Sequence, residues 1–390
     1  MDRSNWLYIY ICILTCTMAN SNRQNKVKEI NMKRWILFII VNVFLIGCAK
    51  TKIVDDIDLV QVAAYDTEAE GKLKGTFAIS AYKGGGEGET KIYSASGQTG
   101  REVLARASEK SSGPLELGQL RVIIFNEKII EKGMQEILET LNRNPSVGNA
   151  IYLAITNVKG ESLLKGNYSK EKEIASYLSS LLEQNMDNGT QPKTNFFMFL
   201  NQLDDDARDS YLPMISKKGN VLELNGIVLF KKHNMVDRVK SKDLFVFKLL
   251  TDNFKQGTYQ FKLPGSSNTH ATIENIKAGT KYKMEGNSEH PFVNAHIQVK
   301  GEIQEFTKTK NLDNPKEIHK LEKIMEKEIE KEASALIKRF IKQGTDPIGL
   351  RKLGRTRVRK WNSQEWEESY KHLRFRVTAD VKVTQSGVTE

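Results

Sequence analysis

The thiol chemistry of this chain is confined to its N-terminal end. Of three cysteines in 390 residues, Cys12 and Cys16 lie upstream of a short apolar leader, and Cys48 stands at the end of that leader. No cysteine follows Cys48. The rest of the polypeptide therefore has no disulfide framework, no cysteine-ligated metal and no cysteine nucleophile, which suits a chain exported across a membrane.

The segment before Cys48 has the composition of a signal peptide. Lys33 and Arg34 give it a positive start, and residues 35–45 are apolar apart from Asn42. A spanning helix needs about 20 apolar residues, so this run is too short to cross a bilayer. We therefore expect residues 32–47 to direct export.

The end of this leader resembles the lipobox of bacterial lipoproteins. Leu45 and Ile46 are followed by the small Gly47 and then by Cys48. The resemblance implies that the leader is removed and that Cys48 becomes an N-terminus carrying diacylglycerol and an N-acyl lipid. Two buried acyl chains, at about 0.8 kcal/mol per CH2, hold a protein on a bilayer where one would be marginal. A plain secretory signal is the alternative.

A second short apolar stretch, residues 6–19, precedes this leader and is followed by a polar run. So few residues do not predict a stable domain. We interpret residues 1–31 as an extension produced by a misassigned translation start, with Met32 as the initiator. A real N-terminal anchor is the alternative, and the nucleotide sequence upstream of codon 32 distinguishes the two.

Residues that commonly perform catalysis do not form a recognisable set, so we expect no enzymatic activity. There is no Gly-x-Ser-x-Gly nucleophile elbow, and no histidine pair has metal-ligand spacing. The triplet at residues 204–206 lacks the glycine and distal glutamate of a calcium loop. Glu116 and Asp252 are candidates for a hydrolase pair, but sequence does not give their separation. The six histidines are His233, His270, His290, His296, His319 and His372.

Residues 338–360 form the most basic stretch of the chain. They contain nine Lys or Arg residues and a single acid, Asp346. Such a segment gains about 1 kcal/mol per charge at an anionic membrane surface. The alternative is a solvated loop that forms ion pairs with the acidic helix expected at residues 322–332.

Composition indicates a folded, exported protein. The formal charge is +11, and removing residues 1–47 leaves +7. Apolar residues make up 39% and charged residues 27%, as in ordinary globular proteins. About 340 residues after the leader predict two or three domains. Nucleic-acid binding is disfavoured because an exported, anchored protein seldom meets nucleic acid.

The fold class expected from hydrophobic periodicity is a mixture of α/β and α+β, with three domains of sheets flanked by helices. Residues 48–210 alternate strands with helices, and residues 84–88 are expected to form a glycine-rich hairpin tip. The strands are expected at residues 59–65, 75–82, 120–125 and 150–157, and the helices at residues 99–108, 133–142 and 170–183.

The second and third expected domains differ in texture. Residues 211–308 are rich in strands, and residues 309–390 combine one long helix near 315–343 with a C-terminal antiparallel strand over residues 374–383. Asn314 and Pro315 are suited to the start of that helix. The strands of the middle domain are expected at residues 221–231, 243–250, 258–263, 271–276, 281–285 and 293–306.

Several segments, taken in order, resemble the Ger(x)C family of spore germination lipoproteins, the C subunits of nutrient germinant receptors. Two positions depart from the family pattern: Gln119 stands where histidine is common, and Arg351 stands where a second turn glycine is usual. The matching segments are residues 96–99, 117–125, Gly133, 143–145, 225–231 and 344–350, followed by Trp366, Tyr370 and the terminal strand that ends at Gly387.

The resemblance implies three α/β domains without a known catalytic site or a cofactor other than the lipid on Cys48. It also implies attachment to the outer surface of the spore inner membrane, with integral membrane A-type and B-type subunits as partners. We therefore expect a non-enzymatic scaffold of a nutrient receptor.

Two other classes compete with this expectation. A solute-binding lipoprotein would show two similar α/β lobes joined by a hinge, and would bind nutrients by itself. A cortex-degrading hydrolase would need an acid/base or metal motif.

Overall fold

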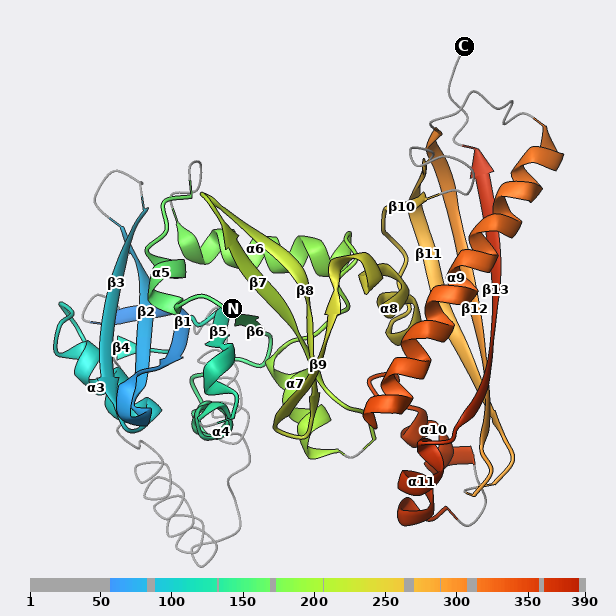
Figure 1. The fold of residues 1–390 in the computed structure, drawn as a ribbon. Helices are drawn as coiled ribbons and strands as arrows, with labels where there is room; N and C mark the ends of the chain where they lie inside the picture. Colours follow the sequence, from blue (N-terminus) through green and yellow to red (C-terminus); the bar gives the residue numbers. More distant parts are fainter. Residues whose placement is uncertain are drawn as a thin grey trace, which may run out of the picture. The chain divides into compact units, whose positions relative to one another are not determined.

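Two β-sheets with helices packed against them form the part of the chain that the structure describes (Figure 1). The computed structural model describes residues 57–82, 88–131, 133–168, 173–205, 207–262, 270–287, 289–306, 314–357 and 361–385. The leader, Cys48 and most of the glycine-rich tip lie outside these ranges. No helix within the ranges is long and apolar enough to span a membrane.

The first sheet has nine strands, with parallel pairing in its centre and antiparallel pairing at its flanks. The short β4 (Leu115–Glu116) pairs with β1 in parallel. Across the sheet, the other strands are β3 (Gly88–Gly97), β2 (Leu73–Tyr82), β1 (Asp58–Thr67), β5 (Val122–Asn126), β6 (Tyr152–Thr156), β7 (Tyr211–Lys218), β8 (Val221–Lys231) and β9 (Asn234–Lys240).

Helices cover both faces of this sheet because its central strands are apolar on both sides. In β5, Ile123 and Phe125 face one hydrophobic core and Val122 and Ile124 face the other. The first core is completed by α3 (Gly100–Ser108), α4 (Met134–Asn142) and α7 (Phe196–Asp204), and the second by α5 (Gly160–Leu164) and α6 (Ile174–Asp187).

The second sheet has four strands, and its last strand corrects an expectation. β10 (Tyr259–Lys262), β11 (His270–Glu285) and β12 (Phe292–Phe306) pair antiparallel. The C-terminal β13 (Arg374–Gln385), expected to be antiparallel, instead pairs with β12 in parallel. Parallel neighbours need a long crossover, and the helical segment between these strands returns the chain to the end where β12 begins.

The main part of that crossover is the long helix α9 (Pro315–Gln343), as predicted. The Asn314 side chain accepts a hydrogen bond from the Lys316 amide at 3.0 Å, which caps the first turn. Gly344 ends the helix with φ +66°, a conformation that glycine adopts without a Cβ clash. Figure 1 shows α9 lying along the second sheet.

Three glutamates of α9 bind the free edge of β13. The amides of Ala379, Val381 and Val383 donate to Glu330, Glu326 and Glu322 at 2.8, 3.4 and 3.0 Å. The glutamates are four residues apart on the helix, a rise of about 6 Å, and the amides are two residues apart on the strand, a rise of about 6.6 Å. Because these spacings nearly match, each carboxylate can reach its amide. The carboxylates thereby satisfy edge amides that would otherwise be free to pair with another strand.

The limits of the sheets do not coincide with the domain boundaries expected at residues 210 and 308. Strands β7 to β9 belong to the first sheet, whereas β10 to β12 share the second sheet with β13. At the first boundary the sheet is narrow, since β6 and β7 pair only at Ile155–Met214 and Thr156–Ile215.

A helix occupies residues that were expected to form a strand. Residues 243–250 contribute mainly to α8 (Leu244–Thr251), which follows a short 3-10 turn and is buried through Leu250. The strand prediction was wrong because a continuous apolar run fits a buried helix and a buried strand equally well. The helix also buries Lys248, whose ammonium donates to the carbonyls of Met186 and Gly189 at 2.8 Å each.

The turn after α9 depends on Asp346. Its carboxylate accepts hydrogen bonds from the amides of Gly349, Leu350 and Arg351 at 2.9, 2.9 and 2.7 Å. These amides begin α10 (Leu350–Arg357), and Gly349 precedes them with φ +88°. Arg351 is already helical, so the backbone at that position does not require the second glycine.

We predict that Glu326→Ala lowers the free energy of unfolding by about 1–3 kcal/mol, because it leaves the buried Val381 amide without its acceptor. Glu328→Ala is the matched control, since Glu328 lies on the same helix and pairs only with the exposed Lys331 in the described part of the chain. Urea denaturation measures both. Equal losses in the two variants would contradict the role assigned to the edge contact.

A second prediction concerns pH. Burial lowers the pKa of Lys248 to about 8, against 10.5 for an ordinary lysine, while Asp252 acts in the opposite direction. Between these two values the unfolded chain binds more protons, so the stability contributed by this group rises with pH. The Lys248→Met variant has no ionisable group at this position and therefore lacks this pH dependence. We expect the stability of the native chain relative to this variant to rise by about 2 kcal/mol between about pH 7.5 and 9.5.

Urea titrations of both proteins across this pH range measure that difference. Lys242→Met, an exposed lysine in the 3-10 turn before α8, is the control and should show no comparable trend. A pH-independent difference for Lys248→Met would refute the lowered pKa.

Candidate functional site

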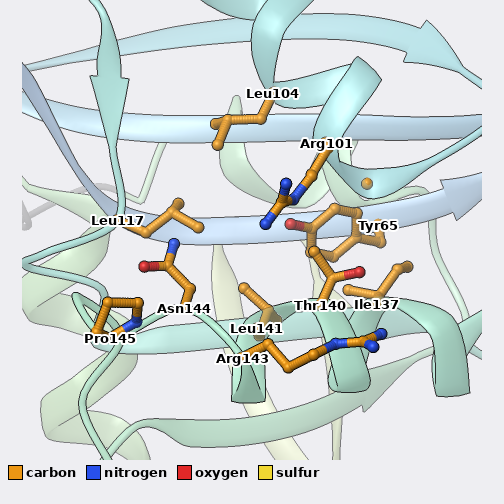
Figure 2. A pocket seen from close by; sticks show the side chains of 11 residues that line it. Tyr65, Arg101, Leu104, Leu117, Ile137, Thr140, Leu141, Arg143, Asn144 and Pro145 are labelled. Atoms are coloured by element: carbon orange, nitrogen blue, oxygen red, sulfur yellow. The ribbon is translucent and has the colours of Figure 1, made fainter.

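A pocket of about 250 Å3 lies between helices α3 and α4, over strand β1 (Figure 2). It is assembled from three stretches of the first sheet unit: the end of β1 with the start of α3, the segment before β5, and the end of α4. The lining residues are Tyr65, Gly100, Arg101, Leu104, Leu117, Ile137, Thr140, Leu141, Arg143, Asn144 and Pro145.

The floor of the pocket is apolar. Ile137 and Leu141 lie one turn apart on α4, so helical periodicity presents both to the pocket. Leu104 of α3 and Leu117 complete this surface. Such a floor provides burial for the apolar part of a small molecule.

Tyr65 supplies a buried polar group. Its side chain is only 2% exposed, and its ring stacks on Phe125 at 5.9 Å and meets Phe77 edge-on at 6.0 Å. These contacts hold the ring in place. Burial raises the pKa of the Tyr65 phenol, so it remains protonated and can donate a hydrogen bond at neutral pH.

The hydroxyl of Tyr65 has no hydrogen-bond partner among the residues that the structure describes. Figure 2 shows it and the Arg101 guanidinium pointing into the same space, with Leu117 and Asn144 on the other side. The hydroxyl opens onto the pocket, so a ligand oxygen bound there would accept its hydrogen bond.

The electrostatics of the pocket favour an anion. Arg101 is exposed at the start of α3, and no described residue forms an ion pair with it. Arg143, at the other side, already lies 3.4 Å from the carboxylate of Glu139. No aspartate or glutamate lines the pocket.

This pocket was not predicted from the sequence, although segments in or beside its wall carry the family resemblance. The segments at residues 96–99, 117–125 and 143–145, which carry the family resemblance, lie next to or within the lining. Gln119, the position where the family usually has histidine, does not line the pocket. These segments are separate in the sequence, and only the folded sheet brings them together around the pocket.

Lipid attachment at the end of the leader stays a prediction. Leu45, Ile46, Gly47 and Cys48 lie outside the described ranges, so no geometry bears on lipid attachment.

Other candidate groups do not assemble into a catalytic or metal site. Within the described ranges, no three His, Cys, Asp or Glu side chains are grouped so as to hold a metal ion. Glu116 lies in β4, whereas Asp252 follows α8 and accepts the Lys193 amide at 2.7 Å. Asp205 lies 3.5 Å from Arg355, and Asp206 is outside the described ranges. Neither Glu116 nor Asp252 lines the pocket.

The basic stretch at residues 338–360 is mostly helical, because it comprises the end of α9 and all of α10. The alternative of a solvated loop paired with the acidic residues of α9 is therefore wrong for its described part. Contact with lipid headgroups stays a prediction. The ion pairs are Arg339–Asp237 at 2.5 Å, Arg351–Glu367 at 2.8 Å and Arg355–Asp205 at 3.5 Å.

Two family models match consecutive parts of the chain. The spore germination protein N-terminal domain matches residues 50–217. The family described as spore germination B3/GerAC-like, C-terminal, matches residues 225–387. Together they account for most of the sequence.

Individual proteins similar to this chain are also spore germination proteins. Spore germination protein GerQC of Bacillus cereus is 94% identical over 359 residues, which cover 92% of this chain and 100% of that protein. Spore germination protein KC of Bacillus subtilis (strain 168) is 24% identical over 339 residues, covering 78% of this chain and 82% of that protein.

The crystal structure of the GerBC protein is similar in fold. The TM-score is 0.51 at 17% identity, covering 82% of this chain and 96% of that chain. This similarity confirms the mixed α/β fold class. With both family models matched and a near-identical relative over its whole length, the chain belongs to the Ger(x)C, or GerAC, family of spore germination proteins.

Proposed function

We propose that this protein is the C subunit of a nutrient germinant receptor in the spore. It acts there as a scaffold that couples integral membrane A-type and B-type subunits to the trigger for germination. The observation that carries the proposal is the 94% identity to spore germination protein GerQC over that protein's whole length.

Attachment to the membrane is assigned to Cys48. The basic start, the short apolar run and the small residue before Cys48 together form a lipoprotein leader. A diacylated thiol places the folded part at the outer face of the spore inner membrane without a spanning helix. No cysteine follows Cys48, so no later residue offers a second thiol for lipid attachment.

A non-enzymatic role is supported by the composition of the pocket. Its lining contains no histidine and no carboxylate, so it lacks the usual groups for acid/base catalysis. The rival solute-binding class is disfavoured by architecture, because a nine-stranded sheet and a four-stranded sheet are not two similar lobes.

We predict that Cys48→Ala moves the protein from the membrane fraction to the soluble fraction and slows nutrient-triggered germination, because the thiol that accepts the lipid is gone. Fractionation of cells and spores measures the first effect, and the loss of spore refractility after nutrient addition measures the second. The thermal unfolding temperature of the soluble variant should show that its domains remain folded.

Thr51→Ala is the matched control, because it changes a side chain three residues after Cys48, leaves the thiol in place and should leave both readouts unchanged. A Cys48→Ala protein that stays in the membrane fraction would rule out lipid attachment at this residue. Normal germination by a fully soluble variant would argue against the receptor role.

A further inference from the structure

We propose that the pocket between α3 and α4 binds a small organic carboxylate with an apolar, branched body. This site does not depend on how the chain is anchored or on which membrane subunits it contacts. The argument rests on the volume of the pocket, its buried hydroxyl and the distribution of charge around it.

The size of the pocket limits the ligand. Sites for drug-sized molecules usually have about 300–1,000 Å3, and this pocket has about 250 Å3. A ligand of metabolite size is therefore expected. Leu104, Ile137 and Leu141 would cover its apolar part, since these side chains form the floor.

The buried hydroxyl selects an acceptor. Tyr65 is held by Phe77 and Phe125, so its ring cannot turn its hydroxyl toward solvent without losing both contacts. It is 2% exposed and faces the pocket (Figure 2). A ligand oxygen placed there would satisfy a donor that no described residue satisfies.

The charge distribution makes that acceptor an anion. Arg101 lines the same pocket as Tyr65, and Figure 2 shows its guanidinium directed into the same space as the Tyr65 hydroxyl. Guanidinium and tyrosine donors together match the two oxygens of a carboxylate.

The same lining disfavours a free ammonium group. No carboxylate side chain is present to pair with a cation. An amino acid would bring an unpaired ammonium into the pocket that Arg101 lines. We therefore expect a simple carboxylate to bind more tightly than the amino acid with the same side chain.

The test uses the purified full-length chain in detergent and three ligands of nearly equal shape. These are 4-methylpentanoate, its neutral amide 4-methylpentanamide, and leucine. Titration calorimetry or ligand-observed NMR at neutral pH measures their affinities. We expect saturable binding of the carboxylate, and binding of the amide and leucine that is weaker by roughly tenfold, because charge-assisted hydrogen bonds are lost or opposed.

Two variants test the donors. Arg101→Gln should weaken 4-methylpentanoate by roughly tenfold and should reduce its advantage over the amide. Tyr65→Phe keeps the ring packing and removes only the hydroxyl, so we expect a loss of about fivefold. Arg106→Gln is the matched control, because Arg106 lies on the same helix but pairs with Glu102 outside the pocket.

Each contrary result overturns the proposal. Absence of saturable carboxylate binding, or equal affinity for the carboxylate and the amide, removes the anion site. If Arg106→Gln weakens 4-methylpentanoate binding as much as Arg101→Gln does, general surface charge rather than the pocket is responsible for the binding. The readout is ligand binding alone, so a failure here leaves the proposed receptor role intact, and a failed fractionation experiment leaves this site intact.

Discussion

Strand β8 is buried on both faces and joins the core formed by the first sheet with α3, α4 and α7 to the core of the second sheet. In β8, Val228 and Phe230 pack with the first sheet and its helices, whereas Ile227 and Leu229 pack with α8, α9 and the second sheet. Alternation of side chains along a strand makes this possible. Strand β7 contributes to the same two cores, so a pair of packed strands rather than a flexible linker connects the two sheets.

The second sheet ends in β13, a parallel strand whose outer backbone amides have no neighbouring strand to pair with. The glutamates of α9 accept hydrogen bonds from these edge amides. The acidic residues of this helix therefore have a structural use that their sequence pattern did not reveal. An edge whose amides are paired in this way does not recruit foreign strands.

The lipid anchor that we propose and the pocket would serve separate functions in one chain. The proposed anchor depends on a thiol and a leader sequence, while the pocket depends on the packing of α3 and α4 over β1. A scaffold subunit needs only the first. The buried Tyr65 hydroxyl and the nearby Arg101 indicate that the folded part also has a recognition surface of its own.

Local chemistry was readable from the sequence wherever it depended on neighbouring residues. The bounds of α9, its Asn314 cap and its Gly344 end follow from short-range preferences, and so does the lipobox resemblance around Cys48. Tertiary structure alone decided the helical state of residues 244–251, the parallel direction of β13 and the pocket that Tyr65 and Arg101 both line. Each of these depends on contacts between residues distant in sequence, and apolar periodicity carries no information about which partner a buried face or a strand edge will find.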